Sequence, residues 1–419
     1  MRFPKIVFLL PLLLSCSGQN SYHPHVPEQG KKSWTAYLCS DPHYLSPSLH
    51  DDGPMFRAVT EENGDGKMVP YSDVLFSAFL EEALEGKPDA MILSGDITFN
   101  GETTSHQEVA QGLKKLLEKG IQPLVVPGNH DIDTHVAYRY EGEEAFPIAS
   151  PTVKEFRNLY FPFGLEQSFQ RMDGAFSYAY QAAEDLVVLA VDGNFSRYYE
   201  VGKEGLAFVE DVLKKAKREG KKVLPFSHQS ALLHNERFQT SYAMNDHEAL
   251  SALYREYDVS LSLAGHWHIQ HIQDGDGFDE ILTSPLCLLE NSYAILKYED
   301  GAFSYSKKRL DMASYAKRHG LEDPIYLGFQ QASYDFFDKI GKRGFSPENI
   351  PEGMEEEDYL AIWNAFLHFN RSYFIGEKVD LSLYQEEISL FEKYPNYLLC
   401  SYMSSILSEF ENDDRVYPN

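Results

Sequence analysis

Metal-binding residue types recur in five short segments of this sequence, each at or near the end of a run of apolar residues. In chain order the segments are Asp41-Pro42-His43, Gly95-Asp96, Gly128-Asn129-His130-Asp131, His228 and Gly265-His266-Trp267-His268. Carboxylate, imidazole and amide groups suit Mn, Fe or Zn better than ions that prefer thiolates. One Asp-x-His motif is common by chance, but an ordered series of five is not. The series therefore predicts a metal-dependent chemical site.

Strands and helices alternate around these segments, which is the pattern of an α/β domain. Strands are expected at residues 35–39, 90–93, 123–126, 176–181, 185–191, 222–226 and 259–263, with helices at 74–84, 106–119, 152–160, 205–218 and 247–257. In such domains the loops that follow the strands carry the functional site. The five segments are therefore expected to meet at one edge of the fold.

The last third of the chain follows a different pattern. Residues 269–309 are expected to form antiparallel strands, with turns at Asp274-Gly275 and Asp300-Gly301. After residue 310 the sequence is helical in character, with helices expected at 327–340, 356–370 and 397–411. This change predicts a helical extension beyond the α/β domain.

The five segments resemble the motif set of the calcineurin-like metallophosphoesterase superfamily. That set is Asp-x-His, Gly-Asp, Gly-Asn-His-Asp/Glu, His and Gly-His-x-His, and all of it is present between about residues 34 and 300. The resemblance implies an α/β (α+β) fold, namely a four-layer sandwich of two mixed β-sheets flanked by helices. It also implies a metal-dependent phosphoesterase that uses two metal ions.

The same resemblance assigns roles to single residues. One ion is expected to be held by Asp41, His43, Asp96 and His268, and the other by Asp96, Asn129, His228 and His266. Asp96 would bridge the two ions, which could be Mn, Fe or Zn. A hydroxide that bridges them would attack phosphorus in line with the leaving oxygen. His130 is not expected to bind metal but to stabilise charge or to protonate the leaving oxygen.

Phe99 separates this sequence from two branches of the superfamily. It stands where the protein-phosphatase branch has an acidic residue and the purple acid phosphatase branch has a ligating Tyr. The sequence is more similar to the bacterial branch that contains cyclic-nucleotide phosphodiesterases, so a small phosphodiester is the expected substrate. A nucleotidase-like phosphomonoesterase and a non-catalytic, surface-binding lipoprotein with the same fold remain the alternatives.

The N-terminus has the features of an export signal. Arg2 and Lys5 flank the start of an apolar stretch, residues 6–14, that is too short to span a bilayer as a helix. Leu13-Leu14-Ser15-Cys16 resembles the lipobox of bacterial lipoproteins, which are cut before the cysteine and acylated on it. More than one acyl chain gives stable anchoring. We therefore expect an exported, extracytoplasmic protein anchored to the bacterial cell membrane through Cys16; the alternative is a plain signal peptide with an incidental cysteine.

These observations divide the chain into four expected regions. They are a lipoprotein-type signal peptide (1–15), a flexible tether (16–32), a catalytic domain (33–309) and a helical C-terminal region (310–419). The formal net charge of −27 disfavours nucleic-acid binding. The expected partners are a small phosphoester and, through the lipid anchor alone, the membrane. An anionic substrate needs a local positive centre, which metal ions would supply.

Several other residues are expected to have structural roles. His106 opens an amphipathic segment and is expected to be exposed or to cap a helix. His234, six residues after His228, is expected at the surface. Cys39, Cys287 and Cys400 are expected to be buried structural residues.

Overall fold

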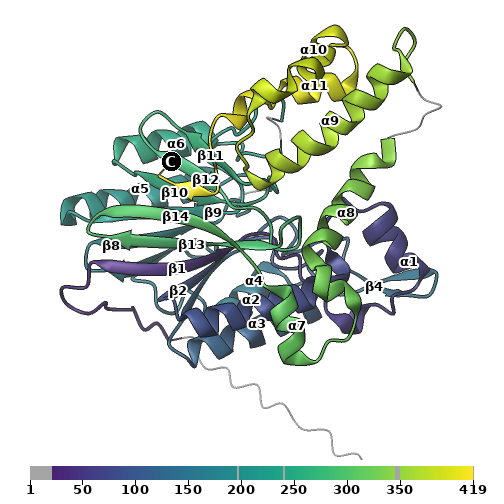
Figure 1. Cartoon of the computed structure of the whole chain (residues 1–419). Coiled ribbons are helices and arrows are strands. Elements are labelled where there is room, and N and C mark those ends of the chain that lie inside the picture. The colour runs from purple at the N-terminus through teal and green to yellow at the C-terminus, as the bar shows by residue number, and fades with distance from the viewer. Residues whose placement is uncertain (1–20, 196–197, 239–240, 345–349, 419) are drawn as a thin grey trace, which may run out of the picture.

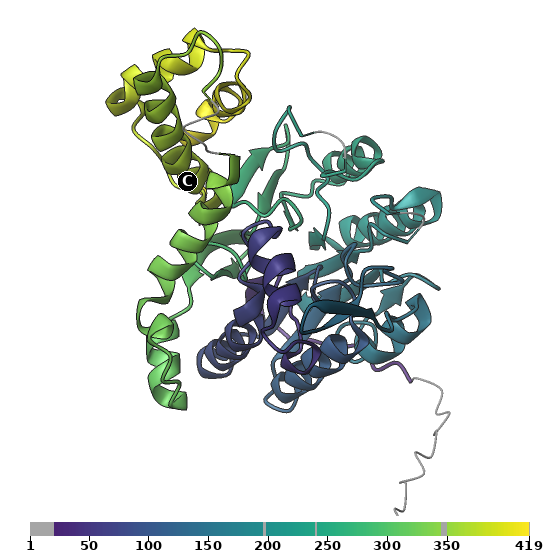
Figure 2. The same cartoon turned by 90° about the vertical axis from the view of Figure 1, so that its right-hand side faces the viewer.

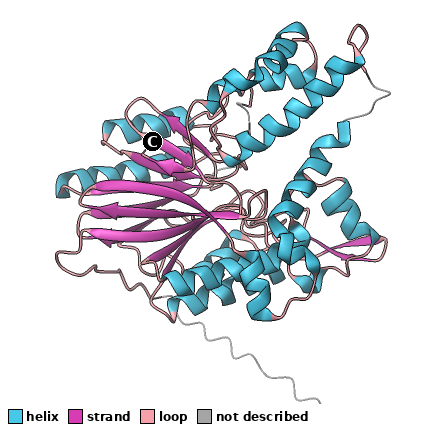
Figure 3. Ribbon diagram, viewed as in Figure 1, coloured by secondary structure: helices cyan, strands magenta, loops and turns pink. Residues whose placement is uncertain are grey.

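Two large mixed β-sheets lie face to face, with helices on both outer sides (Figure 1, Figure 3). The computed structural model describes residues 21–195, 198–238, 241–344 and 350–418. The expected signal peptide and Cys16 lie outside the described residues. The two sheets and their helices form the sandwich that the sequence predicts.

The six-stranded sheet has the order β15-β14-β13-β1-β2-β3. Its strands are β1 (Ser33–Cys39), β2 (Ala90–Ser94), β3 (Gln122–Val126), β13 (Ser292–Glu299), β14 (Ala302–Arg309) and β15 (Val416–Tyr417). β1, β2 and β3 pair in parallel, whereas β13, β14 and β15 join in antiparallel fashion. The parallel strands are buried on both faces, which explains their nearly continuous apolar sequences.

The seven-stranded sheet has the order β11-β12-β10-β9-β8-β7-β6. Its strands are β6 (Gln170–Arg171), β7 (Tyr178–Ala183), β8 (Leu186–Val191), β9 (Lys222–Ser227), β10 (Leu261–Ala264), β11 (His271–Asp274) and β12 (Asp279–Leu282). β8, β9, β10 and β12 are parallel, and the outer pairs are antiparallel. The parallel strands of both sheets thus bring their carboxyl ends to one edge of the sandwich.

Each sheet is covered by two long helices. α2 (Ser72–Gly86) and α3 (Thr103–Leu117) cover the six-stranded sheet, and α5 (Gly202–Glu219) and α6 (His247–Glu256) cover the seven-stranded sheet (Figure 1). One apolar core fills the space between the sheets and extends to α2 and α3. A second core lies between the seven-stranded sheet and its helices. The buried faces of these helices carry the apolar residues at helical spacing.

Two insertions interrupt the regular pattern. The first lies between β1 and α2 and contains the short helix α1 (Pro54–Arg57), a π-helical segment (Ala58–Glu62) and 3-10 helices at Pro47–Leu49 and Val69–Tyr71. The second contains a hairpin of β4 (Tyr138–Glu141) and β5 (Glu144–Pro147), followed by α4 (Val153–Tyr160). α4 begins with a capping box, in which Thr152 and Glu155 bond each other's backbone N–H groups. The hairpin was not expected from the sequence, because its strands are short and largely polar.

The region after residue 310 is mainly helical. It contains α7 (Met312–His319), α8 (Phe329–Gly341), α9 (Glu356–Ile375), α10 (Gln385–Lys393) and α11 (Leu398–Ser404), with short 3-10 turns between several of them. Figure 2 shows α9, α10 and α11 as a group beside the sheets. They share an apolar core that includes Trp267 and Ile269 of the sandwich. The helix expected at 397–411 ends at Ser404, and the chain then returns to the six-stranded sheet as β15.

Within the described residues, every helix is too short or too polar to cross a bilayer.

Residues 21–32 lie along the sandwich: His23 N–H donates to Glu166 O and His25 N–H donates to Gln167 O, both at 2.8 Å. The Arg171 guanidinium also lies over the Tyr22 ring at 3.3 Å.

Candidate metal centre

The five predicted segments meet where the parallel strands of the two sheets end. Asp41 follows β1, Asp96 follows β2 and Asn129 follows β3 of the six-stranded sheet. His228 follows β9 and His266 follows β10 of the seven-stranded sheet. Because both sheets present their carboxyl ends at the same edge, side chains from distant parts of the sequence come within bonding distance of one another.

The backbone at this edge is unusual. Asp41, His43, Asp96, His266 and His268 all have positive φ angles, between 41° and 69°. Such values are uncommon outside glycine, and each costs on the order of 1–3 kcal/mol. Strain of this kind gathers at functional sites, where surrounding structure enforces it. Five of the seven expected ligands are held in this way.

Glycines in two of the motifs allow close packing around the carboxylates. A Cβ atom on Gly128 would lie 2.1 Å from Asp96 Oδ1. A Cβ atom on Gly265 would lie 2.6 Å from Asp41 Oδ2. These contacts are far below van der Waals distance, so space alone requires glycine at both positions.

The first group of side chains, here cluster one, contains Asp41, His43, Asp96 and His268. Nε2 of His43 and Nε2 of His268 are 3.3 Å apart, and Nε2 of His268 is 3.3 Å from Asp41 Oδ1. Nε2 of His43 lies 3.8 Å from Asp96 Oδ2. All four side chains are buried except that of His268, which is 19% exposed. Ligand atoms of all four residues therefore surround one point.

The second group, here cluster two, contains Asp96, His228 and His266, with Asn129 beside them. Nε2 of His228 lies 3.2 Å from both Asp96 Oδ1 and Asn129 Oδ1. Nδ1 of His228 lies 2.8 Å from the Ser94 carbonyl oxygen, which orients the ring. Asp96 belongs to both clusters, one oxygen facing each. The structure thus brings together all seven residues that the resemblance assigned to metal binding.

The charges in the two clusters fit cations. Burial alone would raise the pKa of Asp96, but the charges of His228 and His130 hold it well below its ordinary value. Burial opposes protonation of His228, yet Asp96 raises the pKa of this ring to about 9. An ion that binds His228 must therefore displace a proton. Two buried carboxylates and four imidazoles form a donor set that matches Mn, Fe or Zn. The Asp/His clusters can hold a dinuclear metal centre.

His130 stands next to the clusters but is held differently. Its Nδ1 lies 3.0 Å from the Phe99 carbonyl oxygen and 2.9 Å from Asn100 Oδ1, both of which are acceptors. Nδ1 therefore carries a proton, and Nε2 faces the clusters 4.0 Å from Asp96 Oδ2. The side chain is 32% exposed. Burial lowers the pKa of His130 below its ordinary value.

Asp131, the last residue of the third motif and by adjacency a candidate to orient His130, supports the site in a different way. Asp131 accepts from the N–H groups of Gly128, Ile97 and Thr98 at 2.8–3.1 Å, which ties the loop after β2 to the loop after β3. It does not contact the His130 ring, which Phe99 and Asn100 orient. The motif marked Asp131 but not this role, because the sequence does not show which backbone groups a buried loop carboxylate accepts from.

Two histidines differ from the expectation for them. His106 is fully buried, with Nδ1 2.9 Å from Tyr160 Oη and Nε2 2.9 Å from the Asp131 carbonyl oxygen. His234 is also buried, 2.8 Å from Nδ1 of His271. Both expectations of exposure were wrong, because each ring finds polar partners inside the fold. The three remaining cysteines are buried and free, as expected.

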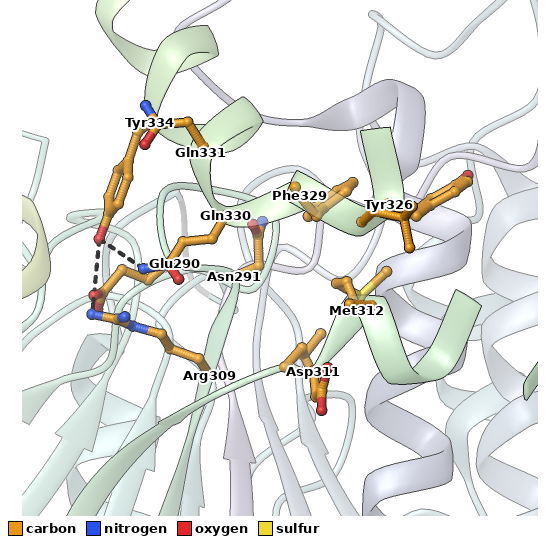
Figure 4. Close-up of a pocket in the computed structure, with 14 residues that line it drawn as sticks. Glu290, Asn291, Arg309, Asp311, Met312, Tyr326, Phe329, Gln330, Gln331 and Tyr334 are labelled. Carbon is orange, nitrogen blue, oxygen red and sulfur yellow. Dashed lines mark hydrogen bonds and ion pairs between the residues drawn. The ribbon is translucent and has the colours of Figure 1, made fainter. Parts of the chain in front are cut away.

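A cavity of about 500 Å³ lies away from the clusters, between the β13–β14 hairpin and helices α7 and α8. Figure 4 shows Glu290 on one side of it, where it accepts from both Arg309 and Tyr334. None of its lining residues belongs to either cluster. The candidate site is therefore the edge where the strands end, and not this cavity.

Comparison with known proteins agrees with the geometry. The family model described as calcineurin-like phosphoesterase matches residues 35–270, which contain every residue of both clusters. A search of curated proteins found no match.

Similar solved structures are distant in sequence. A dimetal phosphatase from Danio rerio is 14% identical, with a TM-score of 0.47, over 66% of this chain and 96% of that one. A purple acid phosphatase from yellow lupin is 13% identical, with a TM-score of 0.44, over 68% and 52%. A putative 5'-nucleotidase from Staphylococcus aureus is 12% identical, with a TM-score of 0.40, over 72% and 58%. The family match covers more than half of the chain, which therefore belongs to the calcineurin-like phosphoesterase family and is a metal-dependent phosphoesterase.

Proposed function

We propose that this chain hydrolyses small phosphodiesters at the two clusters. The observation that carries the proposal is the position of Asp96, which contributes one oxygen to each cluster. A carboxylate shared in this way suits two ions that lie close together. Such pairs of ions act on both the attacking and the leaving oxygen of a phosphoryl group.

Each ion would be held by side chains of this chain alone. Asp41, His43, Asp96 and His268 would hold the first, and Asp96, Asn129, His228 and His266 the second. When bound, the ions supply Lewis-acid chemistry and acidify water near neutral pH. The protein's own contribution is to fix these ligands before the ions arrive. The hydrogen bond between His228 Nδ1 and the Ser94 carbonyl oxygen, for example, holds that ring in place.

His130 would act on the leaving oxygen. The Phe99 carbonyl and Asn100 amide hold the proton on Nδ1, so Nε2 is directed at the reaction space. When Nε2 is protonated as well, the ring can donate that proton to the leaving oxygen as a general acid. Its partial exposure leaves room for substrate beside it.

The choice of a diester rests on Phe99 and on charge. The Phe99 side chain is apolar and buried, so it supplies neither an acidic partner for His130 nor a phenolate ligand. The branches with those groups are the ones from which this sequence differs. A diester also carries one negative charge less than a monoester, so a chain of net charge −27 repels it less. Both points favour the branch with cyclic-nucleotide phosphodiesterases.

A direct comparison of matched substrates tests this proposal. We would measure kcat/KM for a bis-aryl phosphate and for the corresponding aryl phosphate, with Mn, Fe and Zn in parallel. The diester is expected to react at least as well as the monoester. A monoester preference of tenfold or more, about 1.4 kcal/mol of transition-state binding, would overturn the proposal.

A phosphomonoesterase is the second candidate, and one observation favours it. The ammonium group of Lys67 lies 3.3 Å from Nε2 of His43, at the edge of cluster one. An additional positive charge at this edge would match the second negative charge of a monoester. The same kcat/KM ratio decides between the two candidates.

We also propose that the protein is exported and anchored to the bacterial cell membrane through Cys16. The support is the lipobox-like sequence at residues 13–16 after an apolar stretch with basic flanks. In a bacterial host, Cys16→Ser should move the protein out of the membrane fraction or leave it unprocessed. Equal membrane retention of the variant would contradict lipid anchoring.

A further inference from the structure

Lys67 brings a buried ammonium group to cluster one. Its side chain is only 7% exposed, and Nζ lies 3.1 Å from Asp65 Oδ2 and 3.3 Å from Nε2 of His43. Lysine is rarely buried in this way unless it is paired. The residue stands in the insertion between β1 and α2, outside every motif of the sequence. Its position next to a proposed ligand is therefore a new feature of the site.

The main chain determines where Lys67 lies. Met68 N–H donates to the Cys287 carbonyl oxygen at 2.6 Å, and Cys287 Sγ lies 3.3 Å from the Asp41 carbonyl oxygen. On the other side of Lys67, Gly66 has a φ angle of +96° and passes close to the Phe337 side chain of α8. The segment is thus held between the loop that carries Asp41 and helix α8. The fold of the main chain therefore places the ammonium group beside the cluster.

The contact with His43 uses the atom that an ion would need. An ammonium group can only donate, and an unprotonated imidazole nitrogen offers one lone pair. Nε2 of His43 faces the centre of cluster one, close to Nε2 of His268 and to Asp96. Its lone pair can accept from Lys67 or bind an ion, but it cannot do both. An ion at cluster one must therefore move the ammonium group off His43.

The displaced ammonium group would remain near a second cation. Asp65 is its other partner, and that carboxylate is largely exposed, so solvent weakens the pairing. Repulsion between two cations a few ångströms apart is strong where water is excluded. A phosphoryl oxygen placed between the ion and the ammonium group would reverse this repulsion, because it attracts both.

We propose that Lys67 couples metal binding to anion binding: its ammonium group competes with the first ion for Nε2 of His43 and, once displaced, binds a phosphoryl oxygen. This inference rests on the proposed function, since it requires an ion at cluster one. By thermodynamic linkage, a phosphoryl anion tightens binding of the ion by the same factor as the ion tightens binding of the anion. Lys67 thus makes the first metal position depend on substrate.

Calorimetric titration of the full chain with Mn²⁺, with and without saturating inorganic phosphate, tests this role. The variant is Lys67→Met, which keeps most of the apolar stem and removes the charge. Without phosphate, the variant should bind the first Mn²⁺ about tenfold more tightly than the wild type, because the internal competitor is gone. Phosphate should tighten Mn²⁺ binding in the wild type at least about tenfold more than in the variant.

A matched control is Lys114→Met, which removes an exposed lysine from α3 and should behave as the wild type. If Lys67→Met does not fold, judged by its thermal midpoint, Lys67→Gln replaces it. Unchanged Mn²⁺ affinity in a folded variant would overturn the competition. If the variant binds Mn²⁺ more tightly but phosphate still tightens its Mn²⁺ binding as much as in the wild type, the proposed contact between Lys67 and the anion is wrong.

These outcomes are separable from failure of the proposed function, because the titration measures binding and not turnover. A wild-type chain that shows the coupling but hydrolyses neither class of ester would contradict the proposed function and leave the role of Lys67 intact. A chain that hydrolyses diesters but shows no effect of Lys67→Met would contradict the inference alone.

Discussion

Two adjacent parts of the site are built on opposite principles. In the clusters, nitrogen and carboxylate atoms of different residues converge on common points, such as the two ring nitrogens of His43 and His268 that lie 3.3 Å apart. Nδ1 of His43 is buried without a hydrogen-bond partner among the described residues. Around His130, by contrast, donors meet acceptors throughout: Nδ1 faces Phe99 O and Asn100 Oδ1, and Asp131 receives three backbone N–H groups.

The contrast shows which part of the site needs a bound cation and which part the protein completes by itself. The clusters gather lone pairs and charge that only a cation can satisfy together. The support of His130, here the residues Phe99, Asn100 and Asp131, is satisfied by protein groups alone. Substitutions in the clusters should therefore change metal content, whereas substitutions around His130 should change turnover or stability with the ions in place.

The largest effect is expected from Asp96→Asn. Asp96 is the shared member of both clusters, and losing its charge leaves two cations less screened from each other. Activity should be abolished, and bound metal should fall from about two ions per chain toward one or none. Elemental analysis of the dialysed protein measures this. Two tightly retained ions in the variant would show that Asp96 does not bridge.

A smaller but still large effect is expected from His130→Ala. Both ions and the fold should be retained, while turnover falls on the order of 10²–10⁴-fold. The loss should shrink for substrates with good leaving groups, which need no proton. Rates across a series of leaving groups, with metal content measured alongside, provide the test. If the ions are lost, His130 is a ligand and the contrast between the two regions fails.

Asn100→Ala is the matched variant to His130→Ala, because it changes the support of the ring and leaves the ring itself. It removes one acceptor of Nδ1 and leaves the Phe99 carbonyl, so turnover should fall by no more than about tenfold. A loss as great as that of His130→Ala would mean that the amide, rather than the backbone carbonyl, orients the ring.

The smallest effect concerns stability and pH. Glu102 is fully buried next to Asn100, and burial raises the pKa of its carboxyl group from an ordinary value of 4.5 to about 7. The folded chain therefore holds this proton more tightly than the unfolded chain. The resulting stabilisation is present below pH 4.5 and is lost as pH rises through about 7.

Glu102→Gln should remove this dependence, because an amide does not titrate there. When the pH rises from 5 to 8, the free energy of unfolding of the variant should increase relative to that of the wild type by about 1–3 kcal/mol. Thermal midpoints of both proteins at the two pH values measure the gain, and kcat/KM should be unchanged at pH 7 if the support of His130 stays intact. Parallel pH profiles would show that Glu102 is not the group responsible.

The sequence was informative about the clusters for a physical reason. Ligands at strand ends lie in short loops whose place in a parallel sheet is fixed, so the motif spacing was enough to predict that Asp41, Asp96 and His228 meet. The support of His130 was not predictable, because Phe99 acts through its main chain and Asp131 through backbone N–H groups. Lys67 lies in an irregular insertion, and amphipathic spacing alone suggested exposure for His106. Contacts made by loops and by main-chain atoms leave no pattern in side-chain types.

The short strand β15 bears on whether two copies of this protein can pair through their sheet edges. It pairs with Tyr305 and Ser306 of β14, and the Lys307 N–H donates to the Arg415 carbonyl oxygen at 2.8 Å, so among the described residues the rest of that outer strand has no strand partner on this side. An open strand edge is a template on which a second chain can add. Beyond Lys307, whose side chain is buried against Glu290, the end of β14 carries the part-exposed cations Lys308 and Arg309. Charged side chains at a strand edge disfavour the addition of a second chain, so Lys308 and Arg309 protect this end of β14 against self-association into extended sheets.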